Sequence, residues 1–380
     1  MARLPQPLGG TEVLVKQRPL RFSFWPMYRG TRRYGLQSSV FATDPWTVIS
    51  ASIRERCPSL ACAEAEAYLE QARDFYLASQ GAAVIAARPL LQYYCYLNLV
   101  KAFILTKGIR QSLGVARHGI GEVAAPTPAD PLNATLRVFK SPGGRGEYQV
   151  FDEFQQALGF AGLGFQKDYE VVKVLPQVVA GHRLWASAAG RVERFVALHE
   201  ARIMEDKPTR ALWLRLYLVA DDLTRLSLLH KQLVADARLQ GKFQQVCSTE
   251  RFEGRQVLWF EQMQPLHYGQ RASDKVQELV ASAKQLLWCT VASVPPYRRF
   301  YLYVAPAIEH GQVLPQLLSV YLVTYYLGSI TRYRPHYFDA IAKGKFGARI
   351  EEFIAGQPTQ FIYLLASEFA QQNVTKPSIV

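Results

Sequence analysis

The sequence predicts a mainly α-helical fold that contains a small α+β insertion. Three observations predict this class. Residues 88–108 read as a long helix that is apolar on nearly every face, and residues 59–79 before it have amphipathic helical spacing. Helical patterns return from about residue 306, whereas residues 206–305 between them change to strand-like alternation.

The helix over residues 88–108 is expected to organise the core. Pro89 suits a first helical turn, and Gly108 suits a C-terminal stop. A helix that is apolar all round lies in a protein core or in a membrane, and the charge of Lys101 within the run favours the core. Asn98 and Lys101 are neighbours on the helix surface. Two interpretations stay open for them: buried polar groups that have partners, or a polar site inside the helical bundle.

The other elements follow from the same patterns. Residues 59–79 are expected to pack antiparallel on residues 88–108, and residues 171–199 are expected to be mainly helical. Residues 134–140 and 147–151 flank a glycine-rich turn and predict a β-hairpin. Strands are expected at residues 211–220, 242–247, 256–260 and 300–304, with Glu253-Gly254 in a turn. Helices are expected at residues 222–239, 274–291, 314–332, 335–342, 348–355 and 360–371.

These elements divide the chain into four segments. Residues 1–56 form a basic and aromatic arm, and residues 57–205 form the first part of a helical core, with the β-hairpin near residues 134–151. Residues 206–305 form the α+β insertion, and residues 306–380 form the second part of the core.

Composition narrows the classes of function. The net charge of +13 and the pI near 9.5 bias the protein toward polyanions, which makes RNA or DNA a candidate partner. The five cysteines are scattered without C-x-x-C spacing, so neither a zinc site nor a disulfide framework is predicted. Phosphate-loop, zinc-protease and nucleophile-elbow motifs are absent, and we expect no metal and no cofactor. The first residues lack the apolar segment of a signal peptide, so we expect a cytoplasmic protein without a membrane partner.

Basic residues interleave with aromatic ones in the arm. Arginine and aromatic side chains together hold phosphates and stack on bases, which makes this segment a candidate nucleic-acid or anion site. The alternative is that the aromatic residues pack on the body of the protein while the arginines face water. The arginines are Arg18, Arg21, Arg29, Arg32 and Arg33.

Two further basic clusters are candidate anion sites. Arg298 and Arg299 lie between Tyr297 and Phe300, at the start of an expected strand. Arg332, Arg334 and His336 follow an uncharged helix, where Pro335 makes the chain turn. Basic groups at a helix C-terminus are also stabilising in themselves, so a purely structural role is the alternative for this cluster.

Two groups of motifs resemble a known family. The first comprises Tyr68-Leu69-Glu70-Gln71-Ala72, Arg88-Pro89-Leu90-Leu91-Gln92-Tyr93-Tyr94, Asn98-Leu99-Val100-Lys101-Ala102 and His118-Gly119. The second comprises Leu314-Pro315-Gln316-Leu317-Leu318, Tyr321, Ser329 and Arg332-Tyr333-Arg334-Pro335. Together they are similar to the bacterial YaaC-like family, from about residue 40 to the end. The resemblance implies a bacterial origin and a helical frame, and it implies no particular activity.

The first expected helix pair also resembles, more loosely, the start of HEPN domains, which occur in RNA-cleaving toxins and phage-defence proteins. HEPN ribonucleases place Arg-x4–6-His on a helix, where the two side chains act on the 2′-hydroxyl and the scissile phosphate. Arg194 with His199 and Arg225 with His230 have this spacing, and both pairs lie on expected helices. Because the chain is basic, about one or two such pairs are expected by chance.

Three functions are therefore carried forward. The first is a non-catalytic nucleic-acid-associated or complex-forming bacterial protein, as in phage defence. The second is a metal-independent endoribonuclease of HEPN type. The third is a purely structural subunit that binds another protein in a complex. The sequence does not give the oligomeric state or the ligand.

Overall fold

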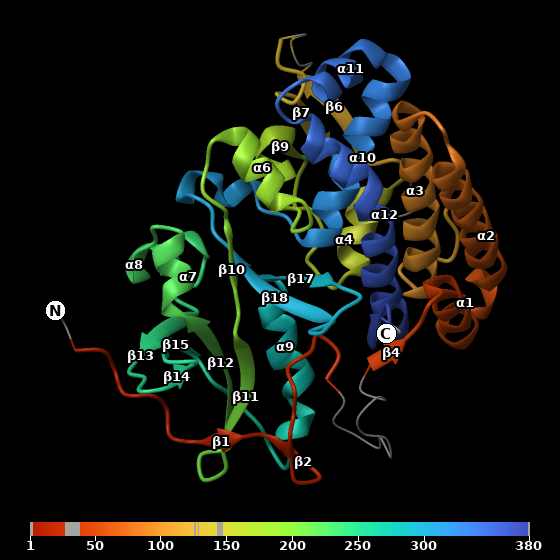
Figure 1. The fold of residues 1–380 in the computed structure, drawn as a ribbon. Helices are drawn as coiled ribbons and strands as arrows, with labels where there is room; N and C mark the ends of the chain where they lie inside the picture. The colour runs from red at the N-terminus through yellow and green to blue at the C-terminus, as the bar shows by residue number, and fades with distance from the viewer. Residues whose placement is uncertain (1–2, 27–38, 125–126, 128, 143–146, 379–380) are drawn as a thin grey trace. The chain divides into compact units, whose positions relative to one another are not determined.

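The computed structural model describes residues 3–26, 39–124, 127, 129–142 and 147–378 (Figure 1). The chain is 46% helical and 22% strand, and one sheet has seven strands. The fold is a mixed α+β fold, so the predicted mainly α class was wrong. Many of the unpredicted strands are two to four residues long and pair with distant segments, and local periodicity does not reveal such pairing.

The chain forms two compact units. Unit 1 consists of residues 1–41, 192–311 and 371–380, and unit 2 consists of residues 42–191 and 312–370. The sequence analysis had placed segment boundaries near residues 56, 205 and 305, whereas the chain passes between these two units near residues 41, 191, 311 and 370. Among the described residues, none of the helices combines the length and apolar character that crossing a bilayer requires.

Unit 1 is built on an antiparallel sheet. Along its main path the order is β1 (Thr11–Glu12), β11 (Glu200–Asp206), β12 (Ala211–Val219), β15 (Arg255–Gln262) and β13 (Phe243–Val246). Two short strands extend it: β14 (Arg251–Phe252) pairs with β15, and β16 (Leu266–His267) pairs with β12. Every residue of β12 is buried, as its run of leucine, tryptophan and tyrosine demands. The predicted strands at residues 211–220, 242–247 and 256–260 are confirmed.

A three-stranded antiparallel sheet completes the core of unit 1, in the order β10 (Phe195–Ala197), β18 (Arg298–Tyr303) and β17 (Leu287–Val291). Two expected helices are shorter than predicted. Residues 222–239 divide into α7 (Ala220–Arg225) and α8 (His230–Asp236), because Ser227 between them has a positive φ of 55°. Helix α9 (Val276–Lys284) stops early, because residues 287–291 pair with β18 as β17.

Unit 1 also contains several short elements. They are β2 (Leu14–Val15), β3 (Arg18–Pro19), β4 (Ser39–Phe41), which pairs in parallel with β19 (Asn373–Thr375), and the 3₁₀ helix η4 (Ala272–Asp274). A further 3₁₀ helix, η5 (Ala307–Gln312), ends at the boundary with unit 2.

A buried ion pair fastens the N-terminal segment to the main sheet. Arg215 and Glu261 are cross-strand partners on β12 and β15, with Nη2 and Oε1 2.5 Å apart and side chains 8% and 0% exposed. Glu261 also accepts hydrogen bonds from the Trp213 indole at 3.2 Å and from the Leu8 backbone N–H at 2.8 Å. The charge of Glu261 is therefore fully partnered, which burial requires.

In unit 2, α3 (Arg88–Thr106) lies among α2 (Ser59–Gly81), α4 (Val150–Ala157), α10 (Gln316–Tyr333) and α12 (Gly347–Ala370). This confirms the predicted organising helix. The pairing with α2 is antiparallel, because contacts move backward along α2 as they move forward along α3. Phe75 stacks on Tyr94, Gln71 accepts from Asn98 at 2.7 Å, and Tyr68 lies 4.8 Å from the Lys101 ammonium. The other helices are α1 (Pro45–Arg56), α5 (Val171–Val174), α6 (His182–Ala189) and α11 (Pro335–Lys343), with 3₁₀ turns η2 (Ile85–Ala87) and η3 (Leu175–Gln177).

Helix α12 runs through a proline. The sequence had ended one helix at residue 355 and begun another at residue 360, but α12 is continuous across Pro358. Proline has no N–H, so the Ile354 carbonyl four residues earlier loses its helical donor. The side chain of Gln92 on α3 replaces that donor, with its Nε2 2.7 Å from the Ile354 oxygen, and it is buried there.

The short strands of unit 2 correct a second prediction. The hairpin expected near residues 134–151 is wrong, because β7 (Thr135–Val138) pairs with β6 (Ile120–Ala124) and β9 (Lys167–Glu170). The other expected strand, β8 (Tyr148–Gln149), instead pairs in parallel with β5 (Ala116–Arg117). Helix α4 starts directly after β8, and its Asp152 accepts the backbone N–H groups of Ser141 and Leu163. The described part of this segment is therefore organised around the Asp152 carboxylate.

Candidate functional site

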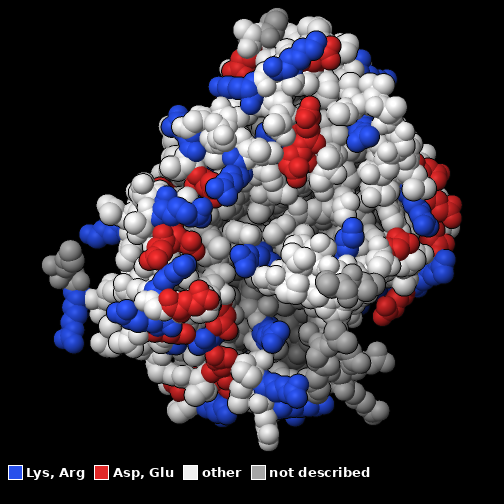
Figure 2. Space-filling model, in the orientation of Figure 1, with Lys and Arg blue, Asp and Glu red and all other residues white. Residues whose placement is uncertain are grey.

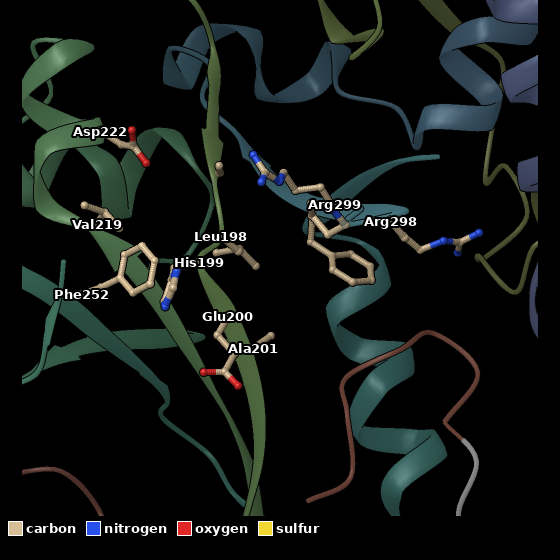
Figure 3. A pocket seen from close by; sticks show the side chains of 12 residues that line it. Leu198, His199, Glu200, Ala201, Val219, Asp222, Phe252, Arg298 and Arg299 are labelled. Atoms are coloured by element: carbon tan, nitrogen blue, oxygen red, sulfur yellow. The ribbon is translucent and has the colours of Figure 1, made fainter. Parts of the chain in front are cut away.

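Unit 1 carries a surface pocket of about 290 Å³ (Figure 3). Its walls come from four places in the chain: the turn between β10 and β11, the end of β12 with the start of α7, the tip of β14, and β18. Residues 197 to 300 contribute to it, so only the folded sheets assemble it. A pocket of this size is at the lower limit of small-ligand sites.

Two aromatic rings form one wall. His199 lies between β10 and β11, where its backbone N–H donates to the Tyr217 carbonyl at 2.9 Å. Phe252 lies at the tip of the β14–β15 hairpin, whose two-residue loop has positive φ at Glu253 and Gly254. Those angles are those of a type I′ turn, which suits the twist of two paired strands. The turn brings the Phe252 ring 4.1 Å from the His199 ring, and Figure 3 shows the two rings facing each other.

The opposite wall carries arginine. Because side chains alternate along a strand, Arg298 and Arg299 of β18 point in opposite directions, as Figure 3 shows. The Arg298 guanidinium lies 5.3 Å from the Trp25 ring. Arg299 is exposed, and it forms no ion pair with any residue in the described ranges. Arg299 is therefore a cation that a ligand can neutralise.

Two carboxylates complete the lining, and they differ in their partners. Glu200 forms an ion pair with Arg202 at 2.6 Å. Burial by itself disfavours the charged form of Arg202, but its contacts with Glu200, Tyr217 and Glu12 have the larger effect. The pKa of Arg202 is therefore raised. Asp222, in the first turn of α7, has no such cation partner among the described residues. The pocket thus offers an aromatic face together with Arg299 and Asp222, neither of which has an ion-pair partner in the part of the chain that the structure describes.

The predicted arm divides between packing and exposure. Phe22 and Phe24 pack edge-on against Phe300, with ring centroids 5.0 and 5.3 Å away. Arg18 and Arg21 are exposed. For these residues the structure agrees with the structural alternative. Arg29, Arg32 and Arg33 lie outside the described residues.

The predicted cluster of Arg332, Arg334 and His336 spans the end of α10 and the start of α11. Arg334 forms an ion pair with Glu122, and the hydrogen bond to that carboxylate raises the pKa of Arg334. Arg332 instead donates to the Tyr94 hydroxyl at 3.3 Å, and the His336 ring lies 4.5 Å from the Tyr337 ring. Each of the three side chains thus has its own contact, and Arg334 is already neutralised by Glu122, so a shared anion site stays a prediction.

Neither Arg–His pair lies on one helix. Arg194 precedes β10 and His199 follows it, and the Arg194 guanidinium is paired with Glu309. Residues 195–197 form a strand, so the expected helix over residues 171–199 is wrong there. Arg225 ends α7 and pairs with Glu193, whereas His230 begins α8. The helical geometry on which the ribonuclease prediction depended is absent at both pairs.

The buried polar pair on α3 has partners. Asn98 is 4% exposed and donates to Gln71. Lys101 is half-buried with its ammonium over the Tyr68 ring, and burial lowers the pKa of Lys101. The first interpretation, a satisfied core amide, therefore fits Asn98.

A comparison with known protein families matches residues 36–369 to the family described as YaaC-like Protein. The chain belongs to the YaaC-like family. No curated protein and no solved structure matches the chain. The match includes the pocket residues of this YaaC-like protein, but it excludes the strands β1, β2 and β3 of the arm.

Sequence reasoning identified His199, Arg298 and Arg299 separately and missed Phe252 and Asp222. The available signal for Phe252 was its position directly before the Glu-Gly turn, which places an aromatic side chain at a hairpin tip. No local pattern connects residue 252 with residue 199, because their contact depends on the pairing of β11 with β12 and of β12 with β15.

Proposed function

We propose that this YaaC-like protein is a non-catalytic nucleic-acid-binding protein that takes one base of a single strand into the pocket of unit 1. The observation that carries the proposal is the exposed His199–Phe252 ring pair beside the unpaired Arg299. A base stacks on aromatic side chains regardless of its identity, and a neighbouring arginine neutralises the adjoining phosphate. Asp222 adds an acceptor for an amino group on the base edge.

The distribution of charge between the two units also favours unit 1 as the part that binds nucleic acid. Unit 1 contains 24 Lys and Arg against 14 Asp and Glu, which is a net charge of +10, and unit 2 contains 20 against 17, which is +3. On the face in Figure 2, basic side chains are interspersed with acidic ones rather than gathered in one continuous patch. The net charge therefore attracts a polyanion from a distance, while the pocket makes the specific contact.

The experiment measures binding of labelled 12-mers by fluorescence anisotropy. We expect single-stranded DNA or RNA to bind more tightly than a duplex, because a duplex keeps its bases stacked. Phe252→Ala is expected to weaken binding about fivefold to a hundredfold, which is the stacking contribution of one base. Arg299→Ala is expected to reduce the slope of log K against log salt by about 0.7, which corresponds to one phosphate contact.

Matched controls lie in unit 2. Phe165→Ala removes an exposed phenylalanine, and Arg191→Ala removes an exposed arginine. Both are expected to bind like the unaltered protein. Equal affinity in all four variants, or no binding by the unaltered protein at low salt, would refute the proposal.

One further variant separates binding from cleavage. His199→Phe keeps a ring against Phe252 but removes the imidazole that a ribonuclease would need. We expect this variant to retain binding and the RNA to stay intact in EDTA with either protein. Cleavage that His199→Phe abolishes would instead favour the endoribonuclease. Participation in phage defence stays a prediction.

A further inference from the structure

Two oppositely charged side chains of the unit 1 pocket have no counter-charge. Asp222 and Arg299 both line the pocket, and no ion pair joins either of them to another residue in the described ranges. In Figure 3 the Asp222 carboxylate and the Arg299 guanidinium lie apart from each other, with the His199 and Phe252 rings below them. A ligand that stacks on the rings therefore meets an acceptor on one side and a cation on the other.

Of the two carboxylates in the lining, Asp222 is the one left for a ligand. Glu200 is held by Arg202, whose Nη2 and Nε lie 2.6 and 2.8 Å from its Oε2. The Asp222 side chain is half-buried and accepts no hydrogen bond from the residues that the structure describes. A ligand that covers these two oxygens must supply donors to them, because a carboxylate is costly to remove from water without hydrogen bonds.

The bases differ in what they offer to a carboxylate. An ionised carboxylate only accepts, and its two oxygens suit two donors that lie side by side. The Watson–Crick edge of guanine carries such a pair, the N1–H and the N2 amino group, and this edge is open in a single strand. Cytosine and adenine place a ring-nitrogen acceptor beside their amino group, and thymine and uracil place a carbonyl on each side of N3–H. In those bases an acceptor would face a carboxylate oxygen.

We propose that Asp222 makes the pocket selective for guanine. Its carboxylate accepts from N1–H and from the N2 amino group, while the base stacks on the His199–Phe252 pair and Arg299 neutralises the adjoining phosphate. This inference rests on the proposed function and deepens it by naming the base. A bidentate contact of this kind discriminates against other bases by about fivefold to a hundredfold in affinity.

The test compares labelled pentanucleotides by fluorescence anisotropy, because a short strand has few registers on the protein. The outer bases are thymine, and the central base is guanine, adenine, cytosine or hypoxanthine, which is guanine without its N2 amino group. We expect the guanine strand to bind about fivefold to a hundredfold more tightly than the adenine and cytosine strands, and more tightly than the hypoxanthine strand. Equal affinity for all four would overturn the guanine inference and leave single-strand binding intact.

Asp222→Asn changes the hydrogen-bonding pattern and keeps the shape of the side chain. Its amide pairs one acceptor with one donor, which matches the amino group and N3 of cytosine and no longer matches guanine. We therefore expect the ratio of guanine to cytosine affinity to fall about fivefold or more. An unchanged ratio in this variant would overturn the role of Asp222.

Asp221→Asn is the matched control. Asp221 precedes Asp222 on α7, but it is exposed, lies 3.7 Å from Arg255 and does not line the pocket. Both variants remove one negative charge, so any general gain in affinity for a polyanion is common to them. Only Asp222→Asn is expected to change the ratio between bases, and an equal change in Asp221→Asn would count against a direct contact. The thermal midpoint of each variant confirms that it folds.

A competition arm separates a guanine in a strand from a free guanine nucleotide. Guanosine 5′-monophosphate is expected to displace the labelled guanine strand less effectively than the unlabelled strand does, because the strand adds phosphate contacts. Equal potency of the two would overturn the assignment to a strand while supporting the pairing of guanine with Asp222. If no strand binds at low salt, the proposed function fails, and the guanine inference fails with it.

Discussion

Replacing Gln92 with leucine is expected to leave the Ile354 carbonyl without a hydrogen-bond donor. That oxygen has no helical donor because residue 358 is a proline, which lacks an N–H. The Gln92 side-chain amide donates to it instead, at 2.7 Å. Both Gln92 and Ile354 are 2% exposed, so water does not replace the amide. An unsatisfied buried carbonyl costs about 1–3 kcal/mol, which is the expected loss in the free energy of unfolding for Gln92→Leu.

The same reasoning predicts how the loss depends on the proline. In Pro358→Ala the residue 358 N–H can donate to Ile354, so Gln92→Leu then leaves no orphaned carbonyl. We expect the cost of Gln92→Leu to fall by about 1 kcal/mol or more in that background. Urea denaturation of the four proteins in the double-mutant cycle, followed by circular dichroism, measures this coupling.

Additivity of the two substitutions would refute the reasoning, because it would show that Gln92 does not substitute for the missing N–H. Asn98→Leu is the matched control on the same helix. Its amide bonds to Gln71 rather than to α12, so its cost should be the same with proline or alanine at position 358.

Three further predictions concern buried or clustered charges. Glu261→Ala is expected to lower the free energy of unfolding by about 3–5 kcal/mol, because it leaves Arg215 buried without its carboxylate partner. Urea denaturation measures this loss, and a loss below about 1 kcal/mol would contradict the prediction. Arg349 is 0% exposed, and its Nε and Nη1 have no hydrogen-bond partner among the described residues. Burial lowers the pKa of Arg349 to about 10. Arg349→Met should therefore keep or raise the free energy of unfolding, measured by the same urea denaturation. Burial lowers the pKa of His118 in the folded protein, so the unfolded chain binds a proton at this residue more readily than the folded chain does. The free energy of unfolding should therefore fall as the pH drops below about 6.5, the usual pKa of histidine. His118→Asn should flatten that part of a plot of thermal midpoint against pH.

The sequence predicted well those elements whose environment is uniform along their length. α3 is apolar on nearly every face because it packs against several helices, and β12 is apolar at every position except Arg215 because all of its residues are buried. In each case burial determines the residue types, so the pattern can be read without knowing the partner.

Elements that depend on a distant partner were not predictable. β17 follows α9 after two residues, and residues 274–291 read as one helix; only pairing with β18 makes the second half a strand. Continuity of α12 across Pro358 likewise depends on Gln92. This residue lies 262 residues earlier in the sequence than Ile354, whose carbonyl accepts its hydrogen bond. A break was the correct local inference, and a tertiary hydrogen bond reverses it.

The candidate sites show the same limit. Arg332 and Arg334 are nearly adjacent, which suggested one anion site, but Glu122 neutralises only Arg334. Composition gives the number of charges in a chain, whereas the distribution of their counter-charges is a property of the fold.

The N-terminal segment illustrates this distinction for the proposed function. Its arginines suggested a basic arm, yet several of its described residues bond to or pack on the rest of unit 1. Leu8 bonds to the buried Glu261, Val13 donates to the Ile203 carbonyl at 2.9 Å, and Phe24 packs on Phe300. Phe300 also lines the pocket, next to Arg299. The segment therefore supports the wall of the proposed nucleic-acid site, and its exposed Arg18 and Arg21 are held on the same folded unit as that wall.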